Sequence, residues 1–311
     1  MAHESPESAA MIEDIYPLSP LQQGMLFNTL LDPGSGVDIE QLLCELYEVL
    51  DVAAFQHAWR CVVARHPVLR TNLRWENLDE PLQEVNARVE LPWEEQDWRA
   101  IAGSERDERF AEFLGADRLR GLELARVPLF RLTLLRYGGA EFRLIWTFHH
   151  TVLEGRAYRL VLEEVFAFYE ALRRGEEAIP PPAPRPYRDY IAWLQQQDFS
   201  KDEAFWRETL KGFTTPTPLV VDHAPDTRHD SRPGHGTQEL LLPAQITSAL
   251  RALARDNQLT LNTIVQGAWA LLLSRYSGEA DVVFGVIRGN RRSTIEGADA
   301  MIGLFLNTLP L

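Results

Sequence analysis

Cysteine is scarce in this chain: Cys44 and Cys61 are its only two cysteines in 311 residues. So few cysteines exclude a disulfide framework and fit a reducing compartment, so the cytoplasm is the expected location. They also lie far from any histidine cluster, which argues against a Cys/His zinc site. The three histidines His223, His229 and His235 fall in a Gly/Pro/Asp-rich segment that is typical of a solvated loop. We therefore expect no bound metal.

Lysine and long apolar runs are scarce as well. Lysine occurs only at Lys201 and Lys211, and the net charge is -14. Binding to a phosphate backbone depends on concentrated positive charge, so nucleic acid is not an expected partner. No apolar run approaches the ~20 residues that span a bilayer, and residues 1–13 have no cationic stretch leading into an apolar one. We expect neither a membrane span nor a secretory signal.

The chain does have enough apolar residues for a substantial interior. Its hydrophobic share is 45%, which at this length can bury one large core or two. Residues 179–186 are too rich in proline for helix or strand and would be stiff in extended form. We predict a two-lobed α/β protein with a disordered N-terminus at residues 1–14. After this segment we predict an N-terminal lobe at 15–178, the linker at 179–186 and a C-terminal lobe at 187–311.

Hydrophobic periodicity and turn signals predict helices and strands along both lobes. Ser19 followed by Pro20 marks the start of one helix, and Ser104 with Asp107 forms a capping-box pattern in which Asp replaces Glu. Further helices are expected at residues 51–65, 156–173, 187–197, 202–210, 244–256 and 260–276, and strands at residues 42–50, 69–75, 82–89, 129–137, 141–148, 238–242 and 281–287.

Residues 149–155, where an apolar strand gives way to a helix, are the most informative stretch. His149 and His150 should point to opposite faces because side chains alternate along a strand, so at most one faces a given cavity. Glu154 lies beyond a short turn, and Gly155 behind it supplies a conformation or close approach that other residues resist. The spacing alone leaves two interpretations open: a chemical site, or buried imidazoles bonded to backbone.

Five stretches in order along the chain resemble the motifs of one family. Residues 16–27 (YPLSPLQQGMLF) are similar to its opening motif, residues 65–71 to its second motif, and residues 149–155 to its HHxxxDG motif. Residues 187–193 resemble its YxDY motif and residues 302–310 its GxFxNTLP stretch. The family is the condensation domains of nonribosomal peptide synthetases, a branch of the acyltransferases. One match would be weak, whereas five in the right order are specific.

The resemblance implies a fold of two chloramphenicol-acetyltransferase-like lobes in a V shape. Chains of the family continue past the position of Leu311, so the resemblance implies a C-terminally truncated domain with an incomplete second lobe. Such a chain is either a truncated form or a natural fragment. A missing part of a sheet would expose a strand edge and apolar surface.

The resemblance also implies a reaction. An acyl or peptidyl thioester on an upstream carrier protein is attacked by the amine of an aminoacyl group on a downstream carrier, and an amide forms. Both substrates arrive on phosphopantetheine arms, so no metal or bound cofactor is implied. The implied partners are the two carrier proteins and the neighbouring synthetase domains.

The resemblance assigns roles within residues 149–155. His150 matches the family's second histidine and would be a general base or a group that positions the amine. His149 would brace the turn. The Gly155 amide and the helix that starts there would place a positive dipole end near the developing oxyanion.

Glu154 departs from the family, which has Asp at this position. The family's Asp pairs with an arginine of the second lobe, and residues 284–291 suggest Arg291 as the partner here. Alternatively, Glu154 lies at a solvated helix start and is stabilised by the helix dipole. The motif residues Arg65 and Arg70, with residues 19–23, are interpreted as structural.

Other functions stay open at this point. An epimerisation domain shares the HHxxxDG motif, although residues 156–160 are more similar to the condensation type. A free-standing acyltransferase would use a soluble thioester. An inactive or truncated module would bind carrier proteins without chemistry, and its two supports are Glu154 and the early C-terminus.

Overall fold

The computed structural model describes residues 11–176, 182–219, 239–289, 291 and 295–311. The chain divides into two compact units: Met1–Asp198 with Arg288–Asn307, and Phe199–Ile287 with Thr308–Leu311. Within the described ranges, none of the helices combines the length and apolar composition that a membrane crossing requires.

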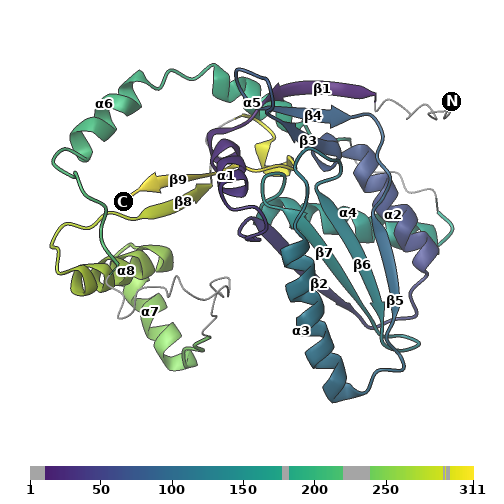
Figure 1. Ribbon diagram of the computed structural model, residues 1–311. Coiled ribbons are helices and arrows are strands. Elements are labelled where there is room, and N and C mark those ends of the chain that lie inside the picture. The colour runs from purple at the N-terminus through teal and green to yellow at the C-terminus, as the bar shows by residue number, and fades with distance from the viewer. Residues whose placement is uncertain (1–10, 177–181, 220–238, 290, 292–294) are drawn as a thin grey trace, which may run out of the picture. The chain divides into compact units, whose positions relative to one another are not determined.

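A four-stranded sheet in the order β2-β7-β6-β5 is the frame of the first unit (Figure 1). Strands β2 (Ile39–Leu46), β7 (Phe142–His149) and β6 (Phe130–Arg136) are antiparallel neighbours, and β5 (Trp93–Asp97) runs parallel to β6. The turn between β6 and β7 contains the glycine pair at residues 138–139, so the predicted hairpin is confirmed.

Helices cover both faces of this sheet. On one face, α2 (Val52–Arg65) packs against α4 (Gly155–Arg173), and the opposite face carries α3 (Gly103–Arg120) (Figure 1). Because side chains alternate along β7, its residues pack against the helices on both faces of the sheet. Trp146 belongs to the cluster formed with α2 and α4, whereas Ile145 belongs to the cluster that α3 covers.

A second core in the first unit involves a three-stranded sheet in the order β1-β4-β3. The sheet consists of β1 (Ile12–Pro17), β4 (Leu82–Asn86) and β3 (Thr71–Arg74), and β3 follows the short helix η1 (Pro67–Arg70). Its buried residues pack with those of three further elements: α1 (Pro20–Leu31), α5 (Tyr187–Gln195) and the segment around η3 (Ala298–Ala300).

The second unit contains three helices in its described part: α6 (Ser200–Thr209), α7 (Ala244–Asp256) and α8 (Leu261–Ser277). Gly278 ends α8 with a φ of 76°, a conformation that glycine adopts without a Cβ clash. Strands β8 (Gly285–Gly289) and β9 (Leu306–Pro310) form a two-stranded sheet, and each contains residues of both units.

Some sequence predictions differ from the structure. Helix α3 begins one residue before Ser104, its N-cap is Ala102, and no side chain caps it, so the predicted capping box is wrong. Residues 239–242 form no strand, and their leucines are exposed. Residues 12–14 belong to β1 rather than to a disordered N-terminus. Strand β5 was not predicted, because its residues WEEQD lack apolar alternation.

The predicted linker lies partly outside the described residues. Residues 182–186 form no regular element, and residues 179–181 belong to a range that the structure does not describe. The compact units divide at Asp198, beyond α5. The lobe boundary at residues 179–186 stays a prediction.

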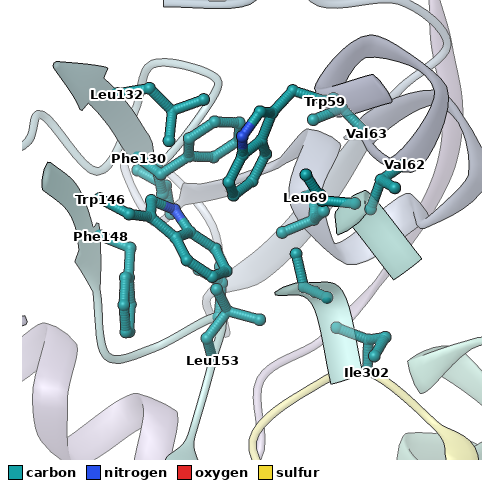
Figure 2. Packing of buried hydrophobic residues seen from close by; sticks show 14 of the residues in the cluster. Trp59, Val62, Val63, Leu69, Phe130, Leu132, Trp146, Phe148, Leu153 and Ile302 are labelled. Atoms are coloured by element: carbon teal, nitrogen blue, oxygen red, sulfur yellow. The ribbon is translucent and has the colours of Figure 1, made fainter. Parts of the chain in front are cut away.

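Two tryptophans form the centre of the main core. Trp59 of α2 and Trp146 of β7 are fully buried, and their rings meet edge to face with centroids 5.0 Å apart. Figure 2 shows Phe130 and Phe148 beside them. Burial and edge-to-face contact both stabilise such a pair. Helix α2 is therefore fixed on the sheet that carries the histidines.

Replacing Trp59 with alanine is expected to lower the free energy of unfolding by about 3–5 kcal/mol, because the surrounding core cannot close the cavity completely. Chemical denaturation measures the change. The control is Phe27→Ala, which removes a side chain that is 63% exposed and should change stability by less than about 0.5 kcal/mol. Equal losses in the two variants would contradict this assignment of the core.

Candidate functional site

The histidine turn is anchored at both ends. Strand β7 ends at His149, which lies opposite Ile39 of β2, and the next amide, that of His150, donates a hydrogen bond to the Asp38 carbonyl at 2.8 Å. Val152 and Leu153 then turn inward and are buried in the main core, where Figure 2 shows Leu153 near Trp146. Pairing before the turn and packing within it determine the path of the backbone.

His149 is buried, with an exposed fraction of only 2%. The Thr151 amide donates to its Nδ1 at 3.2 Å, so Nδ1 is an acceptor and Nε2 carries the hydrogen. Nε2 then donates to the Thr29 hydroxyl at 3.3 Å. Burial, followed by the charge of His150, lowers the pKa of His149 to about 4. A neutral, fully bonded imidazole of this kind suits the predicted brace.

His150 is held in the opposite tautomer. Its Nδ1 lies 2.8 Å from the Leu153 carbonyl oxygen, which can only accept, so Nδ1 carries the hydrogen. The lone pair of the neutral ring is then on Nε2. The side chain is half-buried rather than enclosed. The structure therefore leaves Nε2 of His150 as a nitrogen that can accept a proton.

Gln22 joins α1 to the histidine turn and was missed as a site residue. Its Nε2 donates to the Thr151 carbonyl at 2.8 Å and to Gln83 Oε1 at 3.0 Å, and its Oε1 accepts from the Ser19 amide at 2.9 Å. The side chain is completely buried. The pattern S-x-x-Q at residues 19–22 is a capping-box signature that could have pointed to this residue, although not to its contact with Thr151.

Glu154 and Arg291 form a buried ion pair. Arg291 Nε donates to Glu154 Oε1 at 2.5 Å, and the two residues are 8% and 4% exposed. Glu154 is thus not at a solvated helix start, and its carboxylate does not cap α4. Burial lowers the pKa of the Arg291 guanidinium, whereas the carboxylate of Glu154 acts in the opposite direction.

Arg291 also organises the segment that precedes β9. Its Nη1 donates to the carbonyls of Ala298 and Met301 at 2.8 and 2.7 Å, and its guanidinium lies 4.2 Å from the ring centroid of Phe305. These donor contacts and the cation–π contact compensate part of the cost of burying the charge. The ion pair therefore connects the start of α4 to residues 298–305, and all of these residues belong to the first unit.

Glycine is not required sterically at position 155. Gly155 is the first residue of α4, has no positive φ, and an added Cβ would lie 3.8 Å from the Tyr158 hydroxyl, an ordinary contact. The predicted special conformation or close approach is therefore wrong.

The motif residues Arg65 and Arg70 have structural contacts. Arg65 pairs with Glu164 of α4 at 3.0 Å, and Arg70 donates to the Val63 carbonyl at 3.2 Å and to Glu13 at 2.6 Å. These contacts join α2, α4, η1 and β1.

In the part of the chain that the structure describes, no group of three or more His, Cys, Asp and Glu side chains could hold a metal ion. His223, His229 and His235 lie outside the described residues.

The sequence profile of the condensation-domain family matches residues 12–311. This chain belongs to the condensation-domain family. The resemblance carried by the five motifs is thereby confirmed, and the buried ion pair and the two histidines lie within the matched region of this condensation domain.

The relatives of this condensation domain include large synthases. It is 43% identical to one of the linear gramicidin synthase subunits of Brevibacillus parabrevis over 301 residues, which cover 97% of this chain and 6% of that protein. It is 32% identical to surfactin synthase subunit 3 of Bacillus subtilis (strain 168) over 305 residues, or 97% of this chain and 24% of that protein. The chain thus spans a small part of each relative.

A solved structure shares the fold. The first condensation domain of the calcium-dependent antibiotic synthetase, in complex with a substrate analogue, superposes with a TM-score of 0.75 at 23% sequence identity. The match covers 96% of this chain and 70% of that one. The predicted α/β fold of the chloramphenicol-acetyltransferase type is therefore confirmed, whereas the V-shaped arrangement of lobes stays a prediction.

Arg291→Met is expected to lower the free energy of unfolding by about 3–5 kcal/mol, because it leaves the Glu154 carboxylate buried without its partner. In the double variant Glu154→Gln/Arg291→Met, the loss should be smaller than the sum of the two single losses. The control is Arg156→Met, whose pair with Asp299 is exposed and should contribute less than about 1 kcal/mol. Denaturation of all four variants measures these values, and additive losses would contradict the pairing.

The low pKa of His149 predicts a specific dependence of stability on pH. An unfolded histidine titrates near 6.5 and the folded one at about 4, so the unfolded state binds more protons between these values. Stability should fall by about 3 kcal/mol as the pH decreases from about 6.5 to about 4.

The variant His149→Gln should lose this part of the pH dependence. Urea denaturation across this pH range gives the free energy of unfolding of the parent and of the variant. The contributions of the other titrating groups cancel in the difference between the two. The control is His57→Gln, because His57 is exposed on α2. A flat difference curve for His149→Gln would show that burial does not hold this imidazole neutral.

Proposed function

We propose that this chain forms amide bonds between a carrier-bound acyl or peptidyl thioester and the amine of a carrier-bound aminoacyl group. One observation carries the proposal: within the HHxxxDG-type motif, the bond from His150 Nδ1 to the Leu153 carbonyl leaves the lone pair on Nε2. Membership of the condensation-domain family and the similarity to synthases support the substrate class.

The reaction needs one proton acceptor near the amine. The amine nitrogen attacks the thioester carbonyl carbon, the new C–N bond forms, and His150 Nε2 takes a proton from the nitrogen. The C–S bond then breaks, and the imidazolium returns that proton to the departing thiolate. During this cycle Nδ1 keeps its hydrogen and its bond to Leu153, so the ring does not need to rotate.

His149, Glu154 and Gly155 are proposed to act around this step. His149 supports the turn from the buried side, and the ion pair of Glu154 with Arg291 fixes the start of α4. The Glu154 side chain makes no capping bond to α4, and the first backbone N–H groups of the helix, starting at Gly155, are proposed as donors for the developing oxyanion.

The partners follow from this chemistry. Thioester and amine would be delivered on the phosphopantetheine arms of an upstream and a downstream carrier protein, and neighbouring synthetase domains would supply them. The arms are part of the substrates, and the proposed steps use no other cofactor.

A module that binds carriers without chemistry is the alternative function. One of its two supports, the replacement of Asp by Glu154, is weakened because Glu154 still makes a close ion pair with Arg291. An intact His150 with its tautomer determined by Leu153 also favours catalysis.

A single-turnover assay tests the proposal. The chain is mixed with a donor-loaded and an acceptor-loaded carrier protein, and the products are read by intact mass. Amide product is expected from the parent, and His150→Ala should be slower by about 100- to 10,000-fold, because loss of a general base or of a positioning group costs that much.

Thermal melting of both proteins is the control for folding. His150→Ala should melt near the parent, because the half-buried ring makes a single hydrogen bond, to the Leu153 carbonyl, among the residues that the structure describes. A folded parent that transfers nothing would favour the carrier-binding alternative. Equal rates in the parent and in His150→Ala would remove His150 from the mechanism.

A further inference from the structure

Asp38 lies directly opposite His150. Ile39 pairs with His149 in the antiparallel register of β2 and β7, so the next residues outward, Asp38 and His150, face each other across the two strands. The hydrogen bond from the His150 amide to the Asp38 carbonyl, 2.8 Å long, continues this ladder. Opposed residues in an antiparallel pair project their side chains to the same side, within reach of each other.

One carboxylate oxygen of Asp38 lacks a protein donor. Oδ2 is buried, and none of the described residues donates a hydrogen bond to it. A buried acceptor without a donor is costly, and the cost is greater for a charged one. Burial accordingly raises the pKa of Asp38, whereas the charge of His150 lowers it. The carboxylate thus has an electrostatic partner in His150.

We infer that Asp38 is a positioning residue that stabilises the protonated form of His150. The inference rests on the proposed function, in which His150 Nε2 accepts a proton from the amine. Coupling between two sites is reciprocal, so if protonated His150 favours the Asp38 carboxylate, the carboxylate favours protonated His150 by the same free energy. The ring keeps Nδ1–H on Leu153, and the residue that gains the charge is the one that Asp38 opposes across the two strands.

Further titratable and charged groups lie near this pair. Glu40, two residues along β2, raises the pKa of Asp38, and His149 is coupled to His150 from the buried side. From α3, Arg118 donates to the Ile39 carbonyl at 2.8 Å, and Asp32 lines a small cavity together with Asp38 and His149. Burial and the charges of His150 and Glu40 are the causes of the Asp38 shift, so His150 is the cation that opposes its burial.

The first experiment measures the coupling without any reaction. Carbon-13 NMR of the Asp38 side-chain carboxyl gives its titration in the parent and in His150→Gln, a variant whose side chain stays neutral. The carboxyl is expected to titrate at higher pH in His150→Gln, because the favourable charge is lost. Superimposable titrations would overturn the inference.

The second experiment uses the pH–rate profile. Asp38→Asn keeps the size of the side chain but removes its charge, so the acid limb of kcat/KM should change. The acid limb should move to lower pH, because the neutral ring persists further into the acid range, and a loss on the order of three- to tenfold is expected at alkaline pH, where the ring is a weaker base. A uniform loss at every pH would indicate a structural role and would contradict the inference.

The matched control is Glu40→Gln, which removes the same charge from the next residue of β2 that points to the same side. The Glu40 side chain is exposed, so the pH–rate profile of Glu40→Gln should follow that of the parent. An equal displacement in Glu40→Gln and Asp38→Asn would indicate a general charge effect and would overturn the inference.

The two experiments separate the two proposals. An inactive parent with a displaced Asp38 titration in His150→Gln would contradict the proposed function and retain the coupling. An active parent with superimposable titrations and unchanged acid limbs would retain the proposed function and overturn the role of Asp38.

Discussion

The arrangement of the site depends on a buried ion pair. Glu154 and Arg291 are 137 residues apart in sequence, and each would be strongly destabilising if it were buried alone. Arg291 also holds the carbonyls of Ala298 and Met301, so a single guanidinium connects the start of α4 to the segment that precedes β9. Neither segment can shift without separating the charges or releasing those carbonyls. The pair thus fixes the position of the first residues of α4, where the histidine turn ends.

Within the turn, two adjacent histidines have been given different properties by their neighbours. His149 receives a hydrogen bond from the Thr151 amide and is buried against α1, which keeps its ring neutral. His150 donates to the Leu153 carbonyl instead and is half-buried. The same side chain therefore carries its hydrogen on Nε2 at one position and on Nδ1 at the next, because the tautomer follows from the hydrogen bond that each Nδ1 makes.

The fold was predictable where the sequence has a strong period, and the site was predictable to a smaller extent. Residues 156–173 carry a clear amphipathic stripe, and α4 covers nearly the same range, whereas the polar strand β5 is defined by its pairing with β6 and could not be found. The pairing of Glu154 with Arg291 was suggested by a family resemblance, since no local pattern connects residues so far apart. The contacts of Gln22 with Thr151 and of Asp38 with His150 exist only in the folded chain. Sequence periodicity identifies which side of an element is buried, but it does not identify the residue on the other side of the contact.

The tautomer of His150 has an evolutionary consequence. Its partner is the main-chain carbonyl of Leu153, a group that every amino acid possesses, so no substitution at position 153 can delete it. A replacement there can disturb the hydrogen bond only by moving the backbone, which the packing of the buried side chain opposes. His149 likewise accepts from a main-chain group, the Thr151 amide, but its further bonds are to the hydroxyls of Thr29 and Thr151, which single mutations readily remove. Main-chain groups thus set the tautomers of both histidines, and the bonds that a substitution elsewhere can delete are those from His149 to the threonine hydroxyls.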